Sequence, residues 1–155
     1  MRASVKWGLI GGLVAGILLW GRYGEAMSIM YLVCLIFAAL AGREAKGAPV
    51  LVVGAVSGAL TAIVYHVAYY IGGTMDYMTR LGSLTGGGMA QLDLLGFAIS
   101  RLPSLMVSPY TFGRIAIGIL FGVIGAMIGR ALTQAAQRAK TPVEPPNPEQ
   151  PSDLG

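Results

Sequence analysis

Residues 113–132 read GRIAIGILFGVIGAMIGRAL, and this stretch decides the class of fold that the chain can adopt. It is apolar over about the 20 residues that a helix needs to cross a membrane. Four glycines recur in it at intervals of four, three and four residues, which places them on one face of a helix. They are Gly118, Gly122, Gly125 and Gly129. A stripe without side chains lets helix backbones approach closely in lipid, so the stretch predicts a membrane helix packed against another helix.

The composition of the whole chain extends this interpretation. Of the 155 residues, 55% are hydrophobic and only 12% are charged, whereas about a quarter are charged in a typical soluble domain. The chain also has 23 glycines, a residue that is more frequent in transmembrane helices than in soluble ones. We therefore predict an all-α integral membrane protein with one membrane domain over residues 1–140.

Charged residues and prolines divide the apolar sequence into four predicted spans. The spans are about 5–22, 26–42, 49–71 and 109–133. The first two are short, and flanking Lys and Arg side chains would extend them toward the interface. Gly72-Gly73 is expected to end the third helix and Ser108-Pro109 to begin the fourth, because glycine suits a helix C-terminus and proline a first turn. We predict that the four helices form a small glycine-packed bundle.

About 36 residues, 73–108, separate the third and fourth predicted spans, which is long for a connection. Five apolar residues within it recur at helical spacing. They are Leu92, Leu95, Ile99, Leu102 and Met106. We expect a short amphipathic helix over about 90–106 that Pro103 breaks after Arg101. It would lie on the outer membrane surface or fold back over the bundle, either as a packing lid or as a docking or gating segment.

The distribution of lysine and arginine predicts the orientation, because cytoplasmic loops carry an excess of both. With both termini inside, seven cations lie on the cytoplasmic side. They are Arg2, Lys6, Arg43, Lys46, Arg130, Arg138 and Lys140. The four on the other side are Arg22, Arg80, Arg101 and Arg114. We therefore predict a bacterial-type cytoplasmic membrane protein with both ends inside.

The first apolar run has an alternative interpretation. Arg2, Lys6, an apolar core and then Gly24-Glu25-Ala26 resemble the parts of a cleaved signal peptide. Cleavage would leave three spans and place the new N-terminus outside. Without cleavage, Tyr23-Gly24 would join the first two helices as a tight hairpin.

Residues 141–155, TPVEPPNPEQPSDLG, form a proline-rich tail with five of the eight prolines and three of the seven acidic residues. Such a composition cannot bury enough apolar surface to form a core. We predict an extended, disordered cytoplasmic segment, which serves as a spacer or, through its P-x-x-P spacing, as a docking peptide.

Two further helices carry small-residue stripes. The first span has Gly8, Gly12 and Gly16 at intervals of four, and the third has Gly54 and Gly58. Each glycine inside a helix costs about 1 kcal/mol relative to alanine, so we expect every stripe to meet another helix. That helix belongs either to the same chain or to another copy or partner.

His66 is the single histidine, in the segment TAIVYHVAYYIGG at residues 61–73. Because helical side chains lean toward the N-terminus, its imidazole would cover the turn that contains Ala62, with Gly58 beyond. A groove of small residues below a histidine could accept a haem or chlorophyll-like pigment, with His66 as the axial ligand. Proton relay or simple packing beside Tyr65 and Tyr70 are the alternatives.

Other chemistry is sparse. Cys34 is the single cysteine and lies in an apolar run, where a thiol stays protonated and inert. No acidic residue lies deep within a span, and no paired-carboxylate, metal-binding or nucleophilic set is found. The cations are scattered at helix ends rather than clustered, which argues against nucleic acid. We therefore predict a protein that is not an enzyme.

Three functions remain. The first is a structural or accessory component that packs with other membrane helices and lipid, in a homo-oligomer or a larger complex. The second is a tetrapyrrole-binding membrane subunit that uses His66. The third is a small channel or transporter for neutral solutes.

Overall fold

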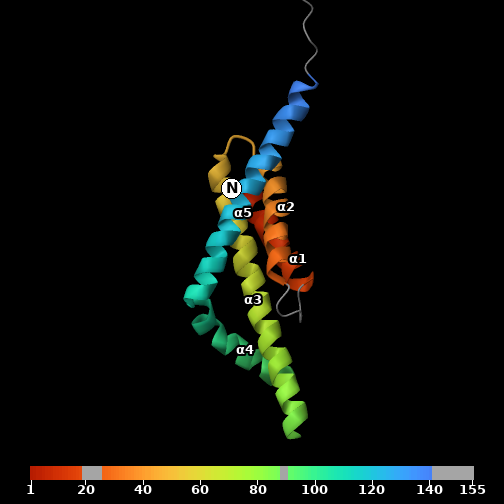
Figure 1. Cartoon of the computed structure of the whole chain (residues 1–155), viewed down its shortest axis with the longest axis vertical. Helices are drawn as coiled ribbons and strands as arrows, with labels where there is room; N and C mark the ends of the chain where they lie inside the picture. The colour runs from red at the N-terminus through yellow and green to blue at the C-terminus, as the bar shows by residue number, and fades with distance from the viewer. Residues whose placement is uncertain (19–25, 88–90, 141–155) are drawn as a thin grey trace, which may run out of the picture.

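A computed structural model describes residues 1–18, 26–87 and 91–140. Over these residues the chain is all-helical, as predicted, with five helices. They are α1 (Arg2–Leu18), α2 (Ala26–Glu44), α3 (Val50–Thr85), α4 (Gln91–Met106) and α5 (Pro109–Arg138). Helices α1, α2, α3 and α5 lie alongside one another (Figure 1). Helix α4 packs across the far part of α3 and leads back to the start of α5.

Two helices are long and apolar enough to cross a membrane by length and composition. They contain Val50–Leu84 in α3 and Pro109–Arg138 in α5. The sequence predicts four spans, but α1 and α2, with 17 and 19 residues, do not meet this criterion within the described chain. Several predicted features lie outside the described residues. They are residues 19–22 of the first span, the hairpin at Tyr23-Gly24, the first two residues of the cleavage site at 24–26, and the tail 141–155.

The prediction that the third helix ends at Gly72-Gly73 is wrong. Helix α3 continues for 36 residues, and its C-cap is Gly86, whose φ of 71° is left-handed. Two glycines weaken a helix without ending it when the following residues favour helix. Asp76 and Arg80 form an i,i+4 ion pair of 3.0 Å on this extension, and α4 packs against it. The predicted long connection is therefore mostly helical.

Helix α4 occupies the predicted amphipathic segment, but Pro103 does not end it. The helix continues through Pro103 to Met106. Proline removes one backbone hydrogen bond, and only one turn remains after it. In that turn Ser104 Oγ donates to the carbonyl oxygen of Arg101 over 2.8 Å. The helix thus runs one turn beyond the expected break.

The buried face of α4 also differs from the predicted one. Leu94 and Ala98 are 4% and 1% exposed, whereas Ile99 is 50% exposed. Leu94 and Ala98 form a second apolar row next to the predicted row that contains Ile99. Periodicity alone does not show which of the two rows is buried. Contact with α3 selects the row that contains Leu94 and Ala98.

Helix α5 begins as the sequence predicts. Ser108 is the N-cap in an extended conformation, with φ −62° and ψ 135°, and Pro109 lies in the first turn. The fixed φ of proline suits a first helical turn, and its missing N–H has no helical partner there. The helix ends at Arg138, beyond the predicted limit of about 133.

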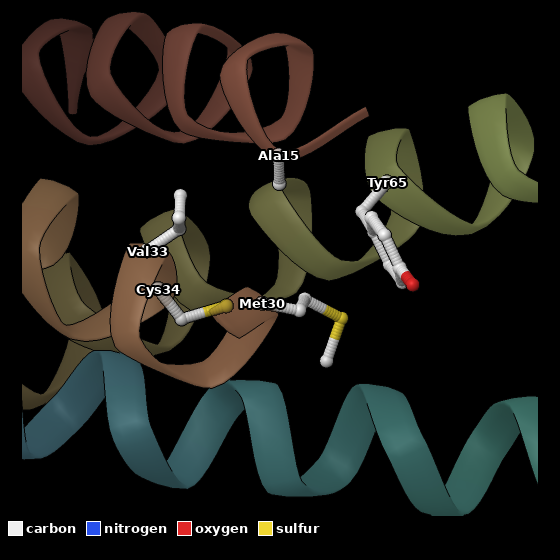
Figure 2. Close-up of a cluster of buried hydrophobic side chains, with 5 residues drawn as sticks. All are labelled: Ala15, Met30, Val33, Cys34 and Tyr65. Atoms are coloured by element: carbon white, nitrogen blue, oxygen red, sulfur yellow. The ribbon is translucent and has the colours of Figure 1, made fainter. Parts of the chain in front are cut away.

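A buried apolar cluster joins α1, α2 and α3. It consists of Ala15, Met30, Val33, Cys34 and Tyr65 (Figure 2). Cys34 is completely buried, and its Sγ lies 4.0 Å from the carbonyl oxygen of Gly58. Tyr31 of α2 stacks on Phe121 of α5 with 5.3 Å between ring centroids, which connects the cluster to the fourth neighbouring helix.

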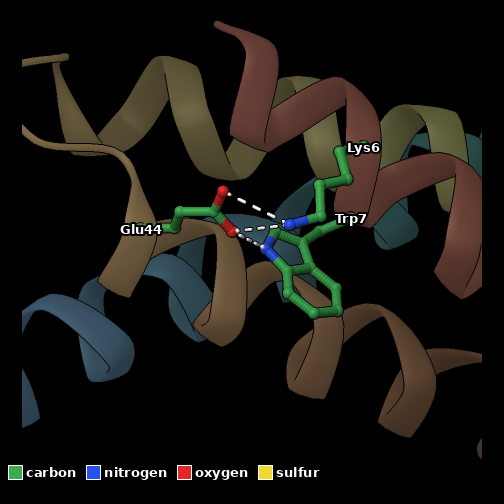
Figure 3. Close-up of polar contacts among 3 residues, drawn as sticks. All are labelled: Lys6, Trp7 and Glu44. Atoms are coloured by element: carbon green, nitrogen blue, oxygen red, sulfur yellow. Dashed lines mark hydrogen bonds and ion pairs between the residues drawn. The ribbon is translucent and has the colours of Figure 1, made fainter.

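A polar contact ties the start of α1 to the end of α2 (Figure 3). The Trp7 indole N–H donates to a carboxylate oxygen of Glu44 over 2.5 Å. Lys6 Nζ lies 3.2 and 3.3 Å from the two oxygens of the same carboxylate. The hydrogen bond from Trp7, and then that from Lys6, lower the pKa of the Glu44 carboxyl below its usual value.

The pKa of Glu44 leads to a pH-dependent stability. Because this pKa is lower in the folded chain, the contact stabilises the fold above about pH 4.3, the ordinary pKa of glutamate. The contribution is lost as the pH falls through the lowered pKa. We expect the Tm in mild detergent, followed by circular dichroism, to fall more between about pH 6 and pH 3 in the unchanged protein than in Glu44→Gln. An equal fall in the two proteins would contradict this account.

Candidate functional site

Polar side chains are buried between the helices where α3 and α5 meet. His66 and Thr111 are completely buried, and Arg114 is only 7% exposed. We call these three residues, together with Tyr70 and Tyr110, the polar cluster. Because α3 is longer than predicted, His66 lies near the middle of its helix rather than near the end.

One ring nitrogen of His66 has a partner and the other does not. Nδ1 lies 2.7 Å from the carbonyl oxygen of Ala62, which can only accept, so Nδ1 carries the proton. Nε2 is buried and has no hydrogen-bond partner among the described residues. The rings of Tyr65 and Tyr70 flank the imidazole, with centroids 5.1 and 6.0 Å away.

Helix α5 occupies the groove of small residues below His66. A Cβ added to Gly118 would lie 2.8 Å from the Cβ of Ala62, and one added to Gly58 would meet the backbone of Gly118 and Gly122. Real Cβ atoms essentially never lie within 3.0 Å of such neighbours. The space in which the sequence suggested a flat macrocycle is therefore filled by another helix of the chain.

Arg114 is the residue whose role the sequence interpretation missed. Its Cζ lies 3.7 Å from the centroid of the Tyr110 ring, and one of its terminal nitrogens donates to the Tyr110 hydroxyl oxygen. Its Nε is buried, and no described residue forms a hydrogen bond with it. The ion pairs among the described residues join Lys6 to Glu44 and Arg80 to Asp76, so no described carboxylate pairs with Arg114.

A sequence signal for this burial existed. Arg114 precedes Gly118 by four residues, as Gly118 precedes Gly122, so all three lie on one helix face. The sequence interpretation assigned Arg114 to the outer cations instead. In the structure Arg114 is buried, and its guanidinium lies over the ring of Tyr110.

Hydrogen bonds within the polar cluster join three helices. The hydroxyl of Thr111 in α5 donates to the carbonyl oxygen of Leu105 in α4 over 3.0 Å. The hydroxyl oxygens of Tyr70 in α3 and Thr111 lie 2.6 Å apart, so Thr111 accepts from Tyr70. This chain of bonds fixes the end of α4 against both long helices.

An apolar groove of about 330 Å³ lies between α3 and α4, next to the polar cluster. Aromatic side chains line it, among them Tyr70, Tyr77 and Phe97. Because Tyr70 belongs to both, the groove adjoins the hydrogen bonds of Thr111.

The glycine stripe of α5 faces two different helices. A Cβ added to Gly122 would lie 2.7 Å from the Cα of Gly58 in α3. A Cβ added to Gly129 would lie 2.7 Å from the carbonyl carbon of Ala39 in α2, and Gly125 meets the backbone of Leu35 in the same helix. The stripe thus passes from α3 to α2 along the length of α5.

The glycines of α1 and α3 also face helices of the same chain. A Cβ added to Gly8 would lie 2.9 Å from the carbonyl oxygen of Ser57, and one added to Gly16 would lie 2.8 Å from the Cβ of Ala68. Gly12 meets the side chain of Val64, and Gly54 meets the backbone of α5. The predicted glycine positions therefore all lie at contacts within the described chain.

The part of the chain that the structure describes contains no group of three or more His, Cys, Asp or Glu that could hold a metal ion. No protein-family model, curated protein sequence or solved structure matches the chain.

The polar cluster makes a direct prediction about stability. Thr111→Val keeps the shape of the side chain but removes the bonds to Tyr70 and Leu105, so we expect it to lower the free energy of unfolding by about 1 kcal/mol. Tyr70→Phe removes one of the same bonds. The double variant should therefore lose less than the sum of the single losses, because the two hydroxyls bond each other. Denaturant unfolding in mild detergent measures all four proteins, and strictly additive losses would contradict the bond.

Proposed function

We propose that the chain is an integral membrane protein in which α1, α2, α3 and α5 all lie in the membrane. Two of these helices are long and apolar enough to span it. The other two present large apolar side chains outward, since Leu13 and Ile17 of α1 are 57% and 74% exposed and Leu32 of α2 is 56% exposed. Large apolar side chains exposed in this way suit lipid better than water.

The polar contacts support an orientation with both termini on the cytoplasmic side. Lys6, Trp7 and Glu44 meet at the end of α1 and α2 that carries the N-terminus. At the same end Arg130 of α5 donates to the carbonyl oxygens of Ala45 and Ala48. Tryptophan and basic side chains are typical of a membrane interface, and the excess of lysine and arginine favours a cytoplasmic side for this interface.

Within the membrane, the proposed function is that of a non-catalytic structural or accessory component. The observation that carries this proposal is the buried charge of Arg114. In this orientation Arg130 lies at the cytoplasmic interface. Arg114 precedes it by 16 residues, which is about 24 Å along α5, so Arg114 still lies within a hydrocarbon core about 30 Å thick. A buried charge without a counter-charge is strongly destabilising, and a charge inside a membrane usually marks a functional site.

None of the described carboxylates pairs with Arg114, and in this proposal another chain supplies the counter-charge. Tyr110, whose ring covers the guanidinium, is itself 61% exposed, so Arg114 lies just beneath the outer surface of α5. A partner helix that presents a carboxylate at Tyr110 would neutralise this charge. Ile117, which follows Tyr110 by seven residues and therefore lies on the same side of α5, is 42% exposed and offers apolar surface beside it. The glycines of α5 contact α3 and α2. The exposed side of α5 around Tyr110, and not the glycine stripe, would therefore meet the partner.

A second candidate is the tetrapyrrole-binding subunit, favoured by the buried and unpartnered Nε2 of His66. A lone pair on that nitrogen is the group that ligates haem iron. The macrocycle would need a place other than the groove filled by Gly118. Visible absorbance that purifies with the chain and disappears in His66→Ala would support this function over the first.

Two variants test whether the glycine stripe of α5 packs against helices of the same chain or against another chain. Gly122→Leu should lower the Tm by 10 °C or more, or prevent isolation of a folded chain, because its side chain would meet the α3 backbone at Gly54 and Gly58. Such overpacking costs several kcal/mol, and each kcal/mol shifts Tm by about 2–4 °C. Gly113→Leu is the matched control, since no atom lies within 4 Å of its added Cβ. A Gly122→Leu chain that stays folded but loses an oligomer would show that the stripe faces outward.

The partner contact at Arg114 can be tested by particle mass. We expect the unchanged chain, extracted from its native membrane in mild detergent, to elute at a mass above that of one chain. Arg114→Gln should shift the particle to the mass of one chain while its circular dichroism stays helical, because the charge that attracts the partner is gone. Arg101→Gln is the control, since Arg101 is an exposed residue of α4. Equal particle masses for Arg114→Gln and the unchanged chain would contradict the accessory function.

A further inference from the structure

A second charged region lies at the opposite end of α5 from the polar cluster. A pocket of about 350 Å³ opens between the connection that follows α2 and the last turns of α5. Three cationic side chains line it, namely Arg43, Lys46 and Arg130. Thr133 and Gln134 of α5 also line it. We call this the cationic pocket.

Arg130 is held firmly at this pocket. One terminal nitrogen donates to the carbonyl oxygens of Ala45 over 2.9 Å and Ala48 over 2.7 Å. These carbonyls lie just beyond the end of α2, where backbone acceptors lack helical partners. A guanidinium has five N–H donors, so these two bonds leave three for a ligand. Arg130 therefore offers a charge at a fixed position.

The other two cations are not neutralised by the described residues. Arg43 and Lys46 are exposed, and neither takes part in a described ion pair. Their neighbour Glu44 is already bound by Lys6 and Trp7 of α1. The pocket thus concentrates three positive charges around a hollow.

The positive surface continues past the pocket. A second hollow of about 330 Å³ shares Arg43 and Thr133 with the first and is also lined by Lys140. Arg43 therefore lies between two hollows, with a fourth cation on the far side. A ligand in the first hollow has room to extend along α5.

We propose that the cationic pocket binds a phosphate group, supplied by the headgroup of an anionic phospholipid. Guanidinium groups match phosphate oxygens in geometry and charge, and lysine adds a point charge. The volume suits one headgroup. The source follows from position, because the pocket lies at the end of the helices where Trp7 and Lys6 mark the proposed interface, and basic pockets on the cytoplasmic side attract anionic lipids.

This lipid source rests on the membrane location proposed above. A bound phosphate would connect the end of α2 through Arg43, the connection after α2 through Lys46, and α5 through Arg130. A ligand that binds only the folded chain raises its stability. The lipid would therefore act as a clamp on the end of the molecule where α2, α3 and α5 meet.

The test uses the full chain purified in an uncharged detergent. Phosphatidylglycerol, which carries one phosphate and a net negative charge, is titrated against zwitterionic phosphatidylcholine, and Tm and bound lipid are followed by circular dichroism and native mass spectrometry. We expect phosphatidylglycerol to raise Tm by about 4 °C and phosphatidylcholine to leave it unchanged. The rise should shrink as salt is added, because exposed charges are screened.

Matched variants locate the binding. Arg43→Gln/Lys46→Gln should weaken phosphatidylglycerol binding by about tenfold, since two of the three charges are lost. Arg2→Gln/Arg138→Gln removes the same charge from residues that line neither hollow, and should bind like the unchanged chain. Arg130 is left intact, because its bonds to Ala45 and Ala48 support the fold.

Several outcomes would overturn the proposal. Equal binding by the two double variants would place the lipid elsewhere, and an equal rise in Tm with phosphatidylcholine would remove the role of charge. An equal rise with inorganic phosphate at about the same concentration would make a soluble phosphate the ligand instead of a lipid. Retention in membranes after alkaline carbonate washing tests the membrane location separately. A chain that is retained but does not bind phosphatidylglycerol refutes the pocket alone.

Discussion

The close approach of α3 and α5 is the contact on which the rest of the structure depends. Gly54 and Gly58 lie against the backbone of Gly118 and Gly122, with no room for a Cβ on any of the four. Dispersion attraction requires atoms in contact, and two backbones without side chains between them bring many atom pairs together. A larger residue at these positions would push the helices apart along their whole length.

This contact also sets the register between α3 and α5, and the register positions both charged regions. At one end it brings Tyr70 to Thr111. At the other it brings Arg130 to the carbonyls that follow α2. A slip of one helical turn is about 5.4 Å, which exceeds the length of either set of hydrogen bonds. The glycine contact and the two polar regions are therefore a single geometric unit.

The two charged regions suit different kinds of recognition. Arg114 is buried and desolvated, so a carboxylate would have to reach it in one geometry to offset the loss of water. Arg43 and Lys46 are exposed, so they attract negative charge in many geometries. Salt weakens this attraction because it screens exposed charges. A partner chain fits the first requirement and an abundant lipid headgroup fits the second. Under the two proposals, one end of α5 would meet a partner chain and the other would meet the membrane surface.

Local features were predictable from sequence. The helical class, the start of α5 at Ser108-Pro109 and the shared face of each glycine stripe follow from periodicity and backbone preference alone. The end of α3 was not predictable, because Gly72-Gly73 marks a local weakness that the packing of α4 on the following turns overrides. The buried face of α4 was not predictable either, because that helix carries two apolar rows and only one of them is buried.

The sequence by itself therefore determined a set of apolar helices with glycine faces, because these depend on neighbours along the chain. Only the tertiary structure decided which face of α5 is inside, that Arg114 is buried while Arg43 is exposed, and that Arg130 reaches Ala45. The spacing of Arg114 from Gly118 places both on one face of α5, but whether that face is inside depends on atoms from other helices.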